Sequence, residues 1–363
     1  MSPTQPSSRL FALLRAALWG TQIEAPLFAE MTDEDWRKTY QLSAKQGVLA
    51  LAWDGLQLLP QPLQPARTIR IQWAYNVEQI ELRYAKQKAA IGKLATFYAS
   101  HNIPMMLLKG YGLSLSYPIP THRPCGDIDI WLFGQQQEAD RLLHAERGIE
   151  IDEDVHHHTV FVFDGVMVEN HYDFFNIHAH QSNKIVESHL KQLAREASPQ
   201  INVGEQKVAL PTADFNALFL LRHASAHFAA VEIGLRHLVD WVMFIEHDGS
   251  KVNWETLYRI AKEMNIDHFL NCINAIAIDQ LGLDPKMIPA FPRNKKLEIR
   301  VMNEILHPEF SEKQPSKGLL KIVWFKTRRW WANRWKHRIV YREGLLRSFI
   351  QSCYAHLLKP KTI

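Results

Sequence analysis

A pair of aspartates separated by one residue is the most informative feature of the sequence. It lies in the run Gly126-Asp127-Ile128-Asp129-Ile130. Because alternate side chains of a β-strand share a face, this run predicts a short strand with Asp127 and Asp129 on one face and the isoleucines in the apolar layer behind. Neighbouring carboxylates repel unless a cation lies between them, and Mg²⁺ or Mn²⁺ prefers such oxygen ligands. We therefore expect a metal site on this strand.

A third acid follows in the same alternating pattern further along the chain. In the run Val166-Met167-Val168-Glu169-Asn170-His171, the residues Glu169 and His171 share one face of a second expected strand. If the two strands are neighbours, Glu169 completes a cluster of three carboxylates. Such a cluster can hold two metal ions about 3.5–4 Å apart, which activate an attacking oxygen and stabilise the leaving group. This arrangement is typical of phosphoryl or nucleotidyl transfer.

The segment before the aspartates contains residue types that bind phosphate. The run Leu107-Leu108-Lys109-Gly110-Tyr111-Gly112 predicts a strand that ends in a glycine turn, followed by a short helix over 113–117. Glycine turns and helix N-termini present free N–H groups to anions. Lys109 adds a positive charge, and we expect Arg123, in the loop before the acidic strand, to add another.

Taken in order, these motifs resemble a known family. The residues that carry the resemblance are Lys109-Gly110, Tyr117-Pro118, Arg123, Gly126-Asp127-Ile128-Asp129 and Val168-Glu169-Asn170-His171. They resemble the uncharacterised bacterial nucleotidyltransferases of the DNA-polymerase-β-like superfamily. The resemblance covers about residues 105–172, and the stretch around 220–245 is also similar to this family's C-terminal domain.

The resemblance implies an α+β fold, in which a polymerase-β-like core of mixed sheet and flanking helices lies between N-terminal and C-terminal helical regions. It also implies a site in which Mg²⁺ or Mn²⁺ meets a nucleoside triphosphate such as ATP. The implied catalytic and metal-binding residues are Asp127, Asp129 and Glu169. The implied nucleotide-binding residues are Lys109, Gly110, Arg123 and His171.

The function expected from the resemblance is transfer of a nucleoside monophosphate from the triphosphate to an acceptor, which can be a small molecule, a protein or an RNA. Many members of the superfamily have serine directly after the glycine, where this chain has Tyr111 after Gly110. This difference leaves open an inactive protein that keeps the fold and binds a nucleotide or a partner. A toxin–antitoxin-type enzyme that modifies a protein or a tRNA is a third interpretation.

The run His156-His157-His158 also suggests a metal site. Because side chains alternate along a strand, only His156 and His158 would share a face, and no cysteine accompanies them. The pattern therefore favours a polar strand edge over structural zinc. A further possibility is that one face lies near the carboxylates as a phosphate contact or proton carrier.

Two pairs of polar residues lie four apart on a helix expected over 214–247. His223 and His227 favour buried, hydrogen-bonded positions between helices over metal binding, and either can line the substrate cleft. Arg236 and Asp240 predict a salt bridge within the helix.

The spacing of apolar residues predicts three regions: a helical region over 1–100, an α/β core over 101–212 and a helical domain over 213–363. The first region includes a long helix over 66–101 that follows a Pro-rich break. The elements expected in the core are strands over 105–108, 128–133, 159–163 and 166–168, a helix over 135–147 and a hairpin turn at Asp164-Gly165.

Composition limits the class of protein. With 363 residues, of which 47% are hydrophobic, the chain can bury a large core, and a formal charge of +4 is too small to indicate a nucleic-acid or membrane partner. Cys125, Cys272 and Cys353 are too far apart for a zinc motif and predict no disulfide framework. We find no signal peptide and no apolar run long enough to cross a membrane, and therefore expect a cytoplasmic protein.

One local basic surface is expected over 324–338, where tryptophan alternates with lysine and arginine in a single helix. Three uses remain open: packing against the protein's own core, peripheral contact with a membrane, and nucleic-acid binding. Tryptophan at helical spacing favours packing.

Overall fold

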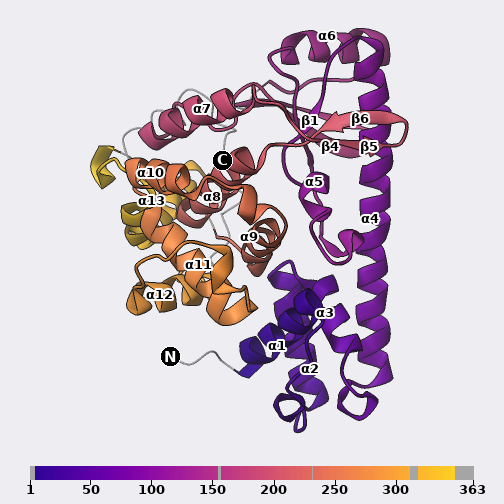
Figure 1. Cartoon of the computed structure of the whole chain (residues 1–363), viewed down its shortest axis with the longest axis vertical. Helices are drawn as coiled ribbons and strands as arrows, with labels where there is room; N and C mark the ends of the chain where they lie inside the picture. Colours follow the sequence, from indigo (N-terminus) through magenta and orange to yellow (C-terminus); the bar gives the residue numbers. More distant parts are fainter. Residues whose placement is uncertain (1–4, 154–156, 231, 311–317, 348–363) are drawn as a thin grey trace.

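The computed structural model describes residues 5–153, 157–230, 232–310 and 318–347. One mixed sheet lies against a long helix, and further helices form two flanking groups (Figure 1). The protein is therefore an α+β protein, as predicted.

The strands and α-helices follow one another in an order that places the strands in the middle of the chain. The strands are β1 (Met106–Leu107), β2 (Ile128–Trp131), β3 (His158–Phe163), β4 (Val166–His171), β5 (Gln200–Val203) and β6 (Gln206–Ala209). The helices before and among them are α1 (Gln5–Trp19), α2 (Asp33–Lys45), α3 (Leu49–Gln57), α4 (Arg67–Ser100), α5 (Tyr111–Ser114), α6 (Gln136–Arg147) and α7 (Gln181–Leu193). The helices after them are α8 (Ala213–Ala230), α9 (Leu235–Asp248), α10 (Trp254–Met264), α11 (Asp267–Leu281), α12 (Lys295–Leu306) and α13 (Leu319–Val340).

The sheet has the strand order β3-β4-β2-β1-β6-β5. β2 pairs in parallel with β4, and β1 in parallel with β6, while the other neighbours are antiparallel. The register of β2 and β4 places Asp129 opposite Glu169. The strand adjacency on which the third carboxylate depended is therefore present.

The β3–β4 hairpin is the best example of a turn predicted from sequence. Its two turn residues, Asp164 and Gly165, have φ values of 49° and 71°. Two successive positive φ values match the twist of the flanking strands, and Asp-Gly adopts them at low cost. The hairpin predicted at these residues is confirmed.

The long helix predicted over 66–101 is confirmed as α4, which runs along the molecule beside both the sheet and the N-terminal helices (Figure 1). Its first half buries Trp73 in an aromatic cluster with Trp36 and Trp53. Its second half buries Ile91 and Leu94 in the separate core beneath the sheet. One helix thus connects two hydrophobic cores.

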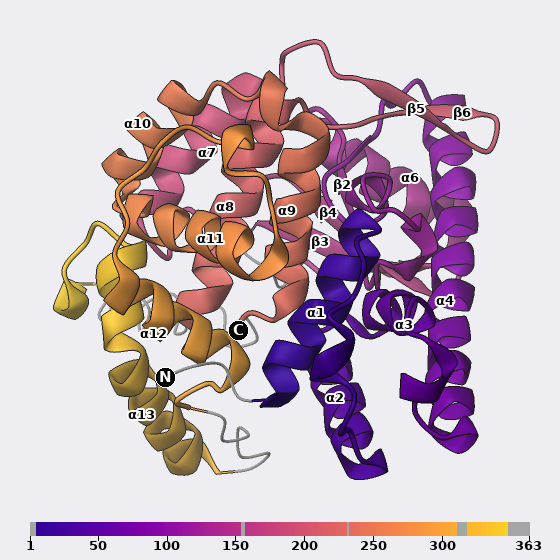
Figure 2. The same ribbon diagram turned by 60° about the horizontal axis from the view of Figure 1, so that its bottom comes forward.

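The N-terminal helices share the larger of these cores with the C-terminal helices. Figure 2 shows α1 between α3 and the C-terminal group, and α1 contacts both α3 and α11. The indole Nε1 of Trp19 donates to the Leu281 carbonyl at 2.6 Å. The division at residues 100 and 212 stays a prediction, since buried apolar contacts cross it.

The contact between α1 and α3 depends on Gly55. A Cβ at this position would lie 2.1 Å from the Leu13 carbonyl oxygen, which is backbone and cannot move aside. We expect Gly55→Ala to lower the free energy of unfolding by about 1–3 kcal/mol, measured by urea denaturation. Gly92→Ala is the matched control, because a Cβ there meets its nearest atom at 3.6 Å, in α4. An alanine in that helix should be neutral or stabilising by about 0.5–1 kcal/mol, and equal losses in both variants would contradict the prediction.

The single helix predicted over 214–247 is wrong, because the chain forms two helices there, α8 and α9. Gly234 between them is extended, with φ −101° and ψ 175°, and a Cβ on it would lie 2.9 Å from the Gln46 carbonyl oxygen. The Gln46 side chain also accepts the Leu235 N–H at 2.9 Å. This close approach to the end of α2 interrupts the helix, and sequence spacing gives no sign of it.

The tryptophan-rich stretch lies in α13. Phe325 and Trp335 are buried, and Lys336, 1% exposed, pairs with Glu304 at 2.6 Å. Packing on the protein's own core is therefore confirmed for this side of the helix. Trp324 and Trp331 are 65% and 61% exposed, so contact with a membrane or a nucleic acid stays a prediction for the other side.

Three further observations concern the remaining predictions. Cys125 and Cys272 are free thiols, and Cys353 lies outside the described residues. None of the described helices is both long enough and apolar enough to cross a membrane. The β5–β6 hairpin and α7 were not predicted.

Candidate active site

The carboxylate cluster lies where β2 and β4 run side by side. The Asp129 side chain is fully buried, and its Oδ1 accepts a hydrogen bond from His171 Nε2 at 3.2 Å. The same His171 nitrogen lies 3.6 Å from Glu169 Oε2. Ligand atoms of Asp129, Glu169 and His171 all lie within 4.8 Å of one another, which is close enough to share a metal ion.

Lys109 reaches this cluster from the neighbouring strand. It follows β1, which pairs with β2, and its Nζ lies 2.9 Å from Asp129 Oδ1. Burial alone would lower the pKa of Lys109, but the nearby Asp129, Asp127 and Glu169 carboxylates raise it. The lysine is therefore a fixed positive charge beside the acids.

The protonation states of the cluster follow from burial and from these contacts. Burial would raise the pKa of Asp129, but the Lys109 charge and the His171 hydrogen bond hold it below its usual value. Burial would lower the pKa of His171, but Asp129 and Glu169 raise it to about 9. Burial raises the pKa of Glu169. The site is thus held together by a carboxylate, an ammonium and an imidazolium.

Asp127 lies just before β2, which begins at Ile128, and lines the same cleft as Asp129 and Lys109. Its backbone is held by Gln87 of α4, whose Nε2 donates to the Asp127 carbonyl at 2.7 Å. Sequence reasoning missed Gln87. The sequence does indicate it, because Gln87 is a polar residue at the helical spacing of the buried residues Tyr84 and Ile91 in α4.

Arg123 is placed differently from what the sequence suggested. Its Nε and Nη2 donate to the two oxygens of Asp240 at 2.8 and 2.9 Å, and its Nη1 donates to the Gly110 carbonyl at 3.0 Å. Tyr117 donates to the same Asp240 carboxylate at 2.5 Å. The predicted Arg236–Asp240 salt bridge is wrong, because Arg123 offers Asp240 a planar pair of donors that matches the carboxylate. Phosphate binding by Arg123 stays a prediction.

Helices α8 and α9 form the opposite wall of the cleft. His223, Arg236, His237 and Trp241 line it, facing Lys109 and the acids. Its enclosed space is about 60 Å³, room for a phosphate-sized group and far below the roughly 300–1,000 Å³ of pockets that enclose small-molecule ligands. This space is too small to enclose a whole nucleotide.

The prediction that His223 and His227 are buried and hydrogen-bonded is wrong for His227, which is exposed. Its ring lies 4.4 Å from the half-buried His223 ring, measured between centroids. Of the two, His223 lines the cleft, as the sequence allowed.

His237 predicts a pH dependence of stability. Burial and the nearby Arg236 charge lower the pKa of His237 from 6.5 to about 4. Below pH 6.5 His237 becomes protonated in the unfolded chain, whereas in the folded chain it stays neutral down to about pH 4. The free energy of unfolding therefore decreases as pH falls from 6.5 towards 4. We expect His237→Gln to reduce this acid-induced loss by up to about 1.4 kcal/mol per pH unit between these values. Urea unfolding from pH 7.5 to 4.5 tests this, and parallel curves for the two proteins would contradict it.

Tyr111, which stands where many superfamily members have serine, is turned away from the cleft. It is buried with its ring 5.4 Å from that of Tyr84. Gly110 has φ 56° and ψ −117°, and the helix after it, α5, has only four residues and begins at Tyr111, not at the predicted Leu113. The turn next to Lys109 is therefore present, but without a hydroxyl from residue 111.

The histidine run lies beside the carboxylates. His158 is buried, and its Nε2 is 3.6 Å from Glu169 Oε1. Strand alternation predicted that His157 would point to the opposite face from His156 and His158. This does not hold for His157, because β3 begins at His158 and alternation does not apply before it. His156 lies outside the described residues. The possibility that this run lies near the carboxylates is confirmed for His158, and its role as a phosphate contact or proton carrier stays a prediction.

A match to known sequences decides the family. The model of a family of uncharacterised nucleotidyltransferases matches residues 32–280, more than half of the chain. The chain belongs to this nucleotidyltransferase family. The match includes Lys109, the two aspartates and Glu169, and extends across α4 and the cleft wall formed by α8 and α9.

A solved structure is similar to part of the chain. An antigenic nucleotidyltransferase-like protein from Paracoccidioides brasiliensis has a crystal structure similar to 45% of this chain and 77% of that chain, with 17% identity and a TM-score of 0.33. At so low a TM-score we infer nothing about function from it. No curated protein sequence is significantly similar to the chain.

Proposed function

We propose that this protein is a metal-dependent nucleotidyltransferase of the polymerase-β-like kind, which transfers a nucleoside monophosphate from a triphosphate to an acceptor. The observation that carries the proposal is the register of β2 and β4, which places Asp129 opposite Glu169, while Asp129 also lines a cleft with Asp127 and Lys109. The acceptor can be a small molecule, a protein or an RNA.

The residues present fit Mg²⁺ or Mn²⁺. Asp129 Oδ2 is buried and has no hydrogen-bond partner among the described residues, and a cation would satisfy it. Glu169 lies within 4.8 Å of Asp129, and Asp127 lines the same cleft as Asp129, so both would offer carboxylate oxygens, the donor type that these ions prefer. When bound, the metal would activate the attacking oxygen and stabilise the leaving pyrophosphate.

The side chains have separate roles in this proposal. Lys109, whose Nζ lies 2.9 Å from Asp129 Oδ1 at the edge of the cleft, would hold the phosphates with its ammonium group. Glu169, with its raised pKa, takes the proton of the acceptor hydroxyl or helps to hold the metal. Arg123 is a positioning residue, since it ties the Gly110 turn to Asp240 of α9.

One observation favours a second function, an inactive protein that keeps the fold and binds a nucleotide or a partner. Tyr111 is buried and supplies no hydroxyl to the cleft, so the triphosphate loses a contact that many superfamily members have.

Two measurements distinguish these functions. First, we expect a nucleoside triphosphate that is a substrate to raise the melting temperature of the protein only when Mg²⁺ or Mn²⁺ is present. Second, after incubation with cell extract, we expect the labelled α-phosphate of this nucleotide to appear on an acceptor in the small-molecule, protein or RNA fraction. A metal-dependent shift without label transfer or pyrophosphate release would favour the inactive binder. If no nucleoside triphosphate shifts the melting temperature with either metal, the nucleotide site is refuted.

A further inference from the structure

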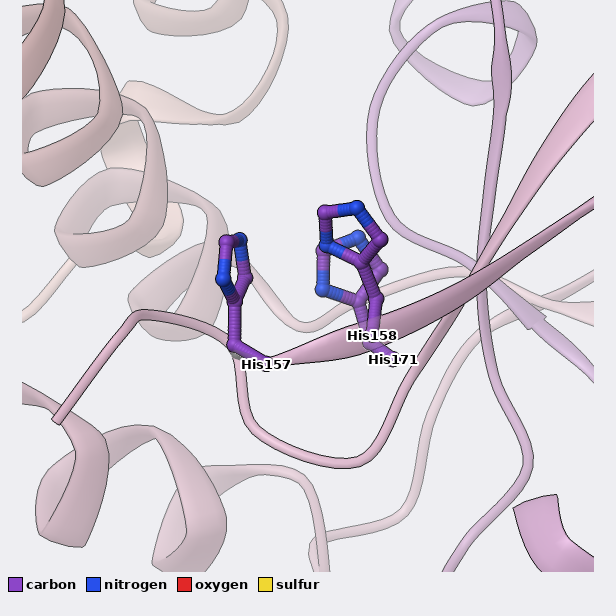
Figure 3. Close-up of side chains that lie close together, drawn as sticks. All are labelled: His157, His158 and His171. Atoms are coloured by element: carbon purple, nitrogen blue, oxygen red, sulfur yellow. The ribbon is translucent and has the colours of Figure 1, made fainter. Parts of the chain in front are cut away.

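The cluster of His157, His158 and His171 is not used by the proposed transfer reaction, apart from the hydrogen bond of His171 to Asp129. His158 and His171 are directly opposite each other on the antiparallel strands β3 and β4. Figure 3 shows their rings side by side, with the His157 ring projecting to the same side of the ribbon. The ring centroids lie 5.0 Å apart for His158 and His171, and 4.3 Å for His157 and His158.

The three imidazoles present ligand atoms close enough for one ion. One ring nitrogen from each lies within 4.8 Å of the other two. Tetrahedral zinc with Zn–N bonds of about 2.0–2.1 Å needs nitrogens about 3.3 Å apart, so nitrogens that now lie up to 4.8 Å apart must approach by up to about 1.5 Å. Rotation of the three side chains would have to supply this movement.

The backbone and neighbouring groups hold these rings in place. The His157 carbonyl accepts the N–H groups of Tyr172 and Asp173 at 3.1 and 3.0 Å, which ties the start of β3 to the end of β4. His171 Nδ1 donates to the Asp173 carbonyl at 3.2 Å, the type of contact that orients metal-bound histidines through their other nitrogen. The strand ends that carry the three rings are thus tied together, and one ring is oriented, in the absence of an ion.

Two observations point to an ion rather than to packing alone. The His158 Nδ1 atom is buried and has no hydrogen-bond partner in the part of the chain that is described. Glu169 stands beside the cluster, 3.6 Å from His158 Nε2 and 3.6 Å from His171 Nε2, and can act as a fourth ligand. Three histidines and a carboxylate suit a borderline transition metal, whereas Mg²⁺ favours an all-oxygen shell.

We propose that His157, His158 and His171, with Glu169 beside them, form a binding site for one Zn²⁺-type divalent transition metal, next to but separate from the Asp127–Asp129 side of the cleft. The proposal does not depend on nucleotidyl transfer. Because His171 Nε2 also contacts Asp129, an ion here withdraws His171 from that carboxylate. The two cation sites are therefore coupled through two shared side chains, His171 and Glu169.

Titration with Co²⁺, a coloured substitute for Zn²⁺, tests the site on the full chain without a histidine tag and in excess Mg²⁺. We expect one equivalent of Co²⁺ to give the intense visible absorption of a tetrahedral site, and Zn²⁺ to abolish it. His157→Gln and His158→Gln should each weaken binding at least ~10-fold. His227→Gln is the matched control and should leave binding unchanged, although it belongs to the other close histidine pair.

Other outcomes overturn the proposal. The proposal is overturned if Co²⁺ gives no tetrahedral spectrum with the unaltered protein. It is also overturned if His227→Gln abolishes Co²⁺ binding while His157→Gln retains it. Asp129→Asn should keep the spectrum; if it abolishes binding, the ion sits among the carboxylates instead. A measurement without variants guards against misfolding: Zn²⁺ should protect His157 from diethylpyrocarbonate, whereas His247, whose side chain is 59% exposed, should react as before. Equal reactivity of His157 with and without Zn²⁺ refutes the site.

Discussion

Replacing Asp129 by asparagine is expected to lower metal-dependent nucleotidyl transfer at least ~100-fold, the scale of losing one electrostatic catalytic group. Asp129 is the fully buried member of the cluster, and its two oxygens have different roles. Oδ1 is bound by Lys109 and His171, while Oδ2 has no partner among the described residues and is the oxygen offered to a cation. The measurement is transfer of labelled α-phosphate, together with the melting shift caused by nucleotide and Mg²⁺.

The same substitution should also reduce stability, because it leaves two buried positive charges without their carboxylate. The catalytic effect must therefore be read at a temperature where the variant is folded. Asp127→Asn is the matched variant, because it removes the same charge from the half-exposed aspartate of the pair. It should also lower nucleotidyl transfer, but with a smaller decrease in melting temperature. Asp164→Asn, in the turn of the β3–β4 hairpin, is the control for removing an acid elsewhere. If Asp129→Asn is folded and transfers at the normal rate, the proposed site is wrong.

Replacing Arg123 by methionine is expected to lower the free energy of unfolding by about 3–5 kcal/mol. The guanidinium and the Asp240 carboxylate are both buried, and their double hydrogen bond connects the loop before β2 with α9. Removing the arginine leaves the aspartate charge without compensation in a low-dielectric interior. Urea denaturation followed by circular dichroism measures the loss.

Two further variants separate this pair from a general effect of charge. Lys93→Met breaks the exposed ion pair with Asp164, in which both partners face solvent, and should cost less than about 1 kcal/mol. Adding Asp240→Asn to Arg123→Met should recover part of the lost stability, because the uncompensated charge is removed. If the Arg123→Met loss is no larger than the Lys93→Met loss, the buried pair does not have this role.

Local structure was predictable where short-range rules apply. The alternation in Gly126-Asp127-Ile128-Asp129-Ile130 predicted a strand with a buried apolar side, and β2 buries Ile128 and Ile130. The Asp164-Gly165 turn required two positive φ values, which that dipeptide adopts readily. The absence of proline within 67–100 predicted the length of α4.

Prediction failed where the partner of a side chain lies far away in the sequence. The helix over 214–247 is interrupted because Gly234 meets Gln46, and Asp240 leaves its neighbour Arg236 for Arg123. In each case a distant group satisfies a buried polar atom better than the local one does. Helical spacing contains no information about such distant groups.

The sequence by itself determined which residues can perform chemistry and on which kind of element each lies, because alternation along a strand and glycine turns act over a few residues. Only the tertiary structure decided which of them meet. The parallel pairing of β2 with β4 placed Glu169 beside Asp129, and the antiparallel pairing of β3 with β4 placed His158 opposite His171. Strand order depends on burying the whole sheet against α4 and the other helices, a property of the complete core that no short motif encodes.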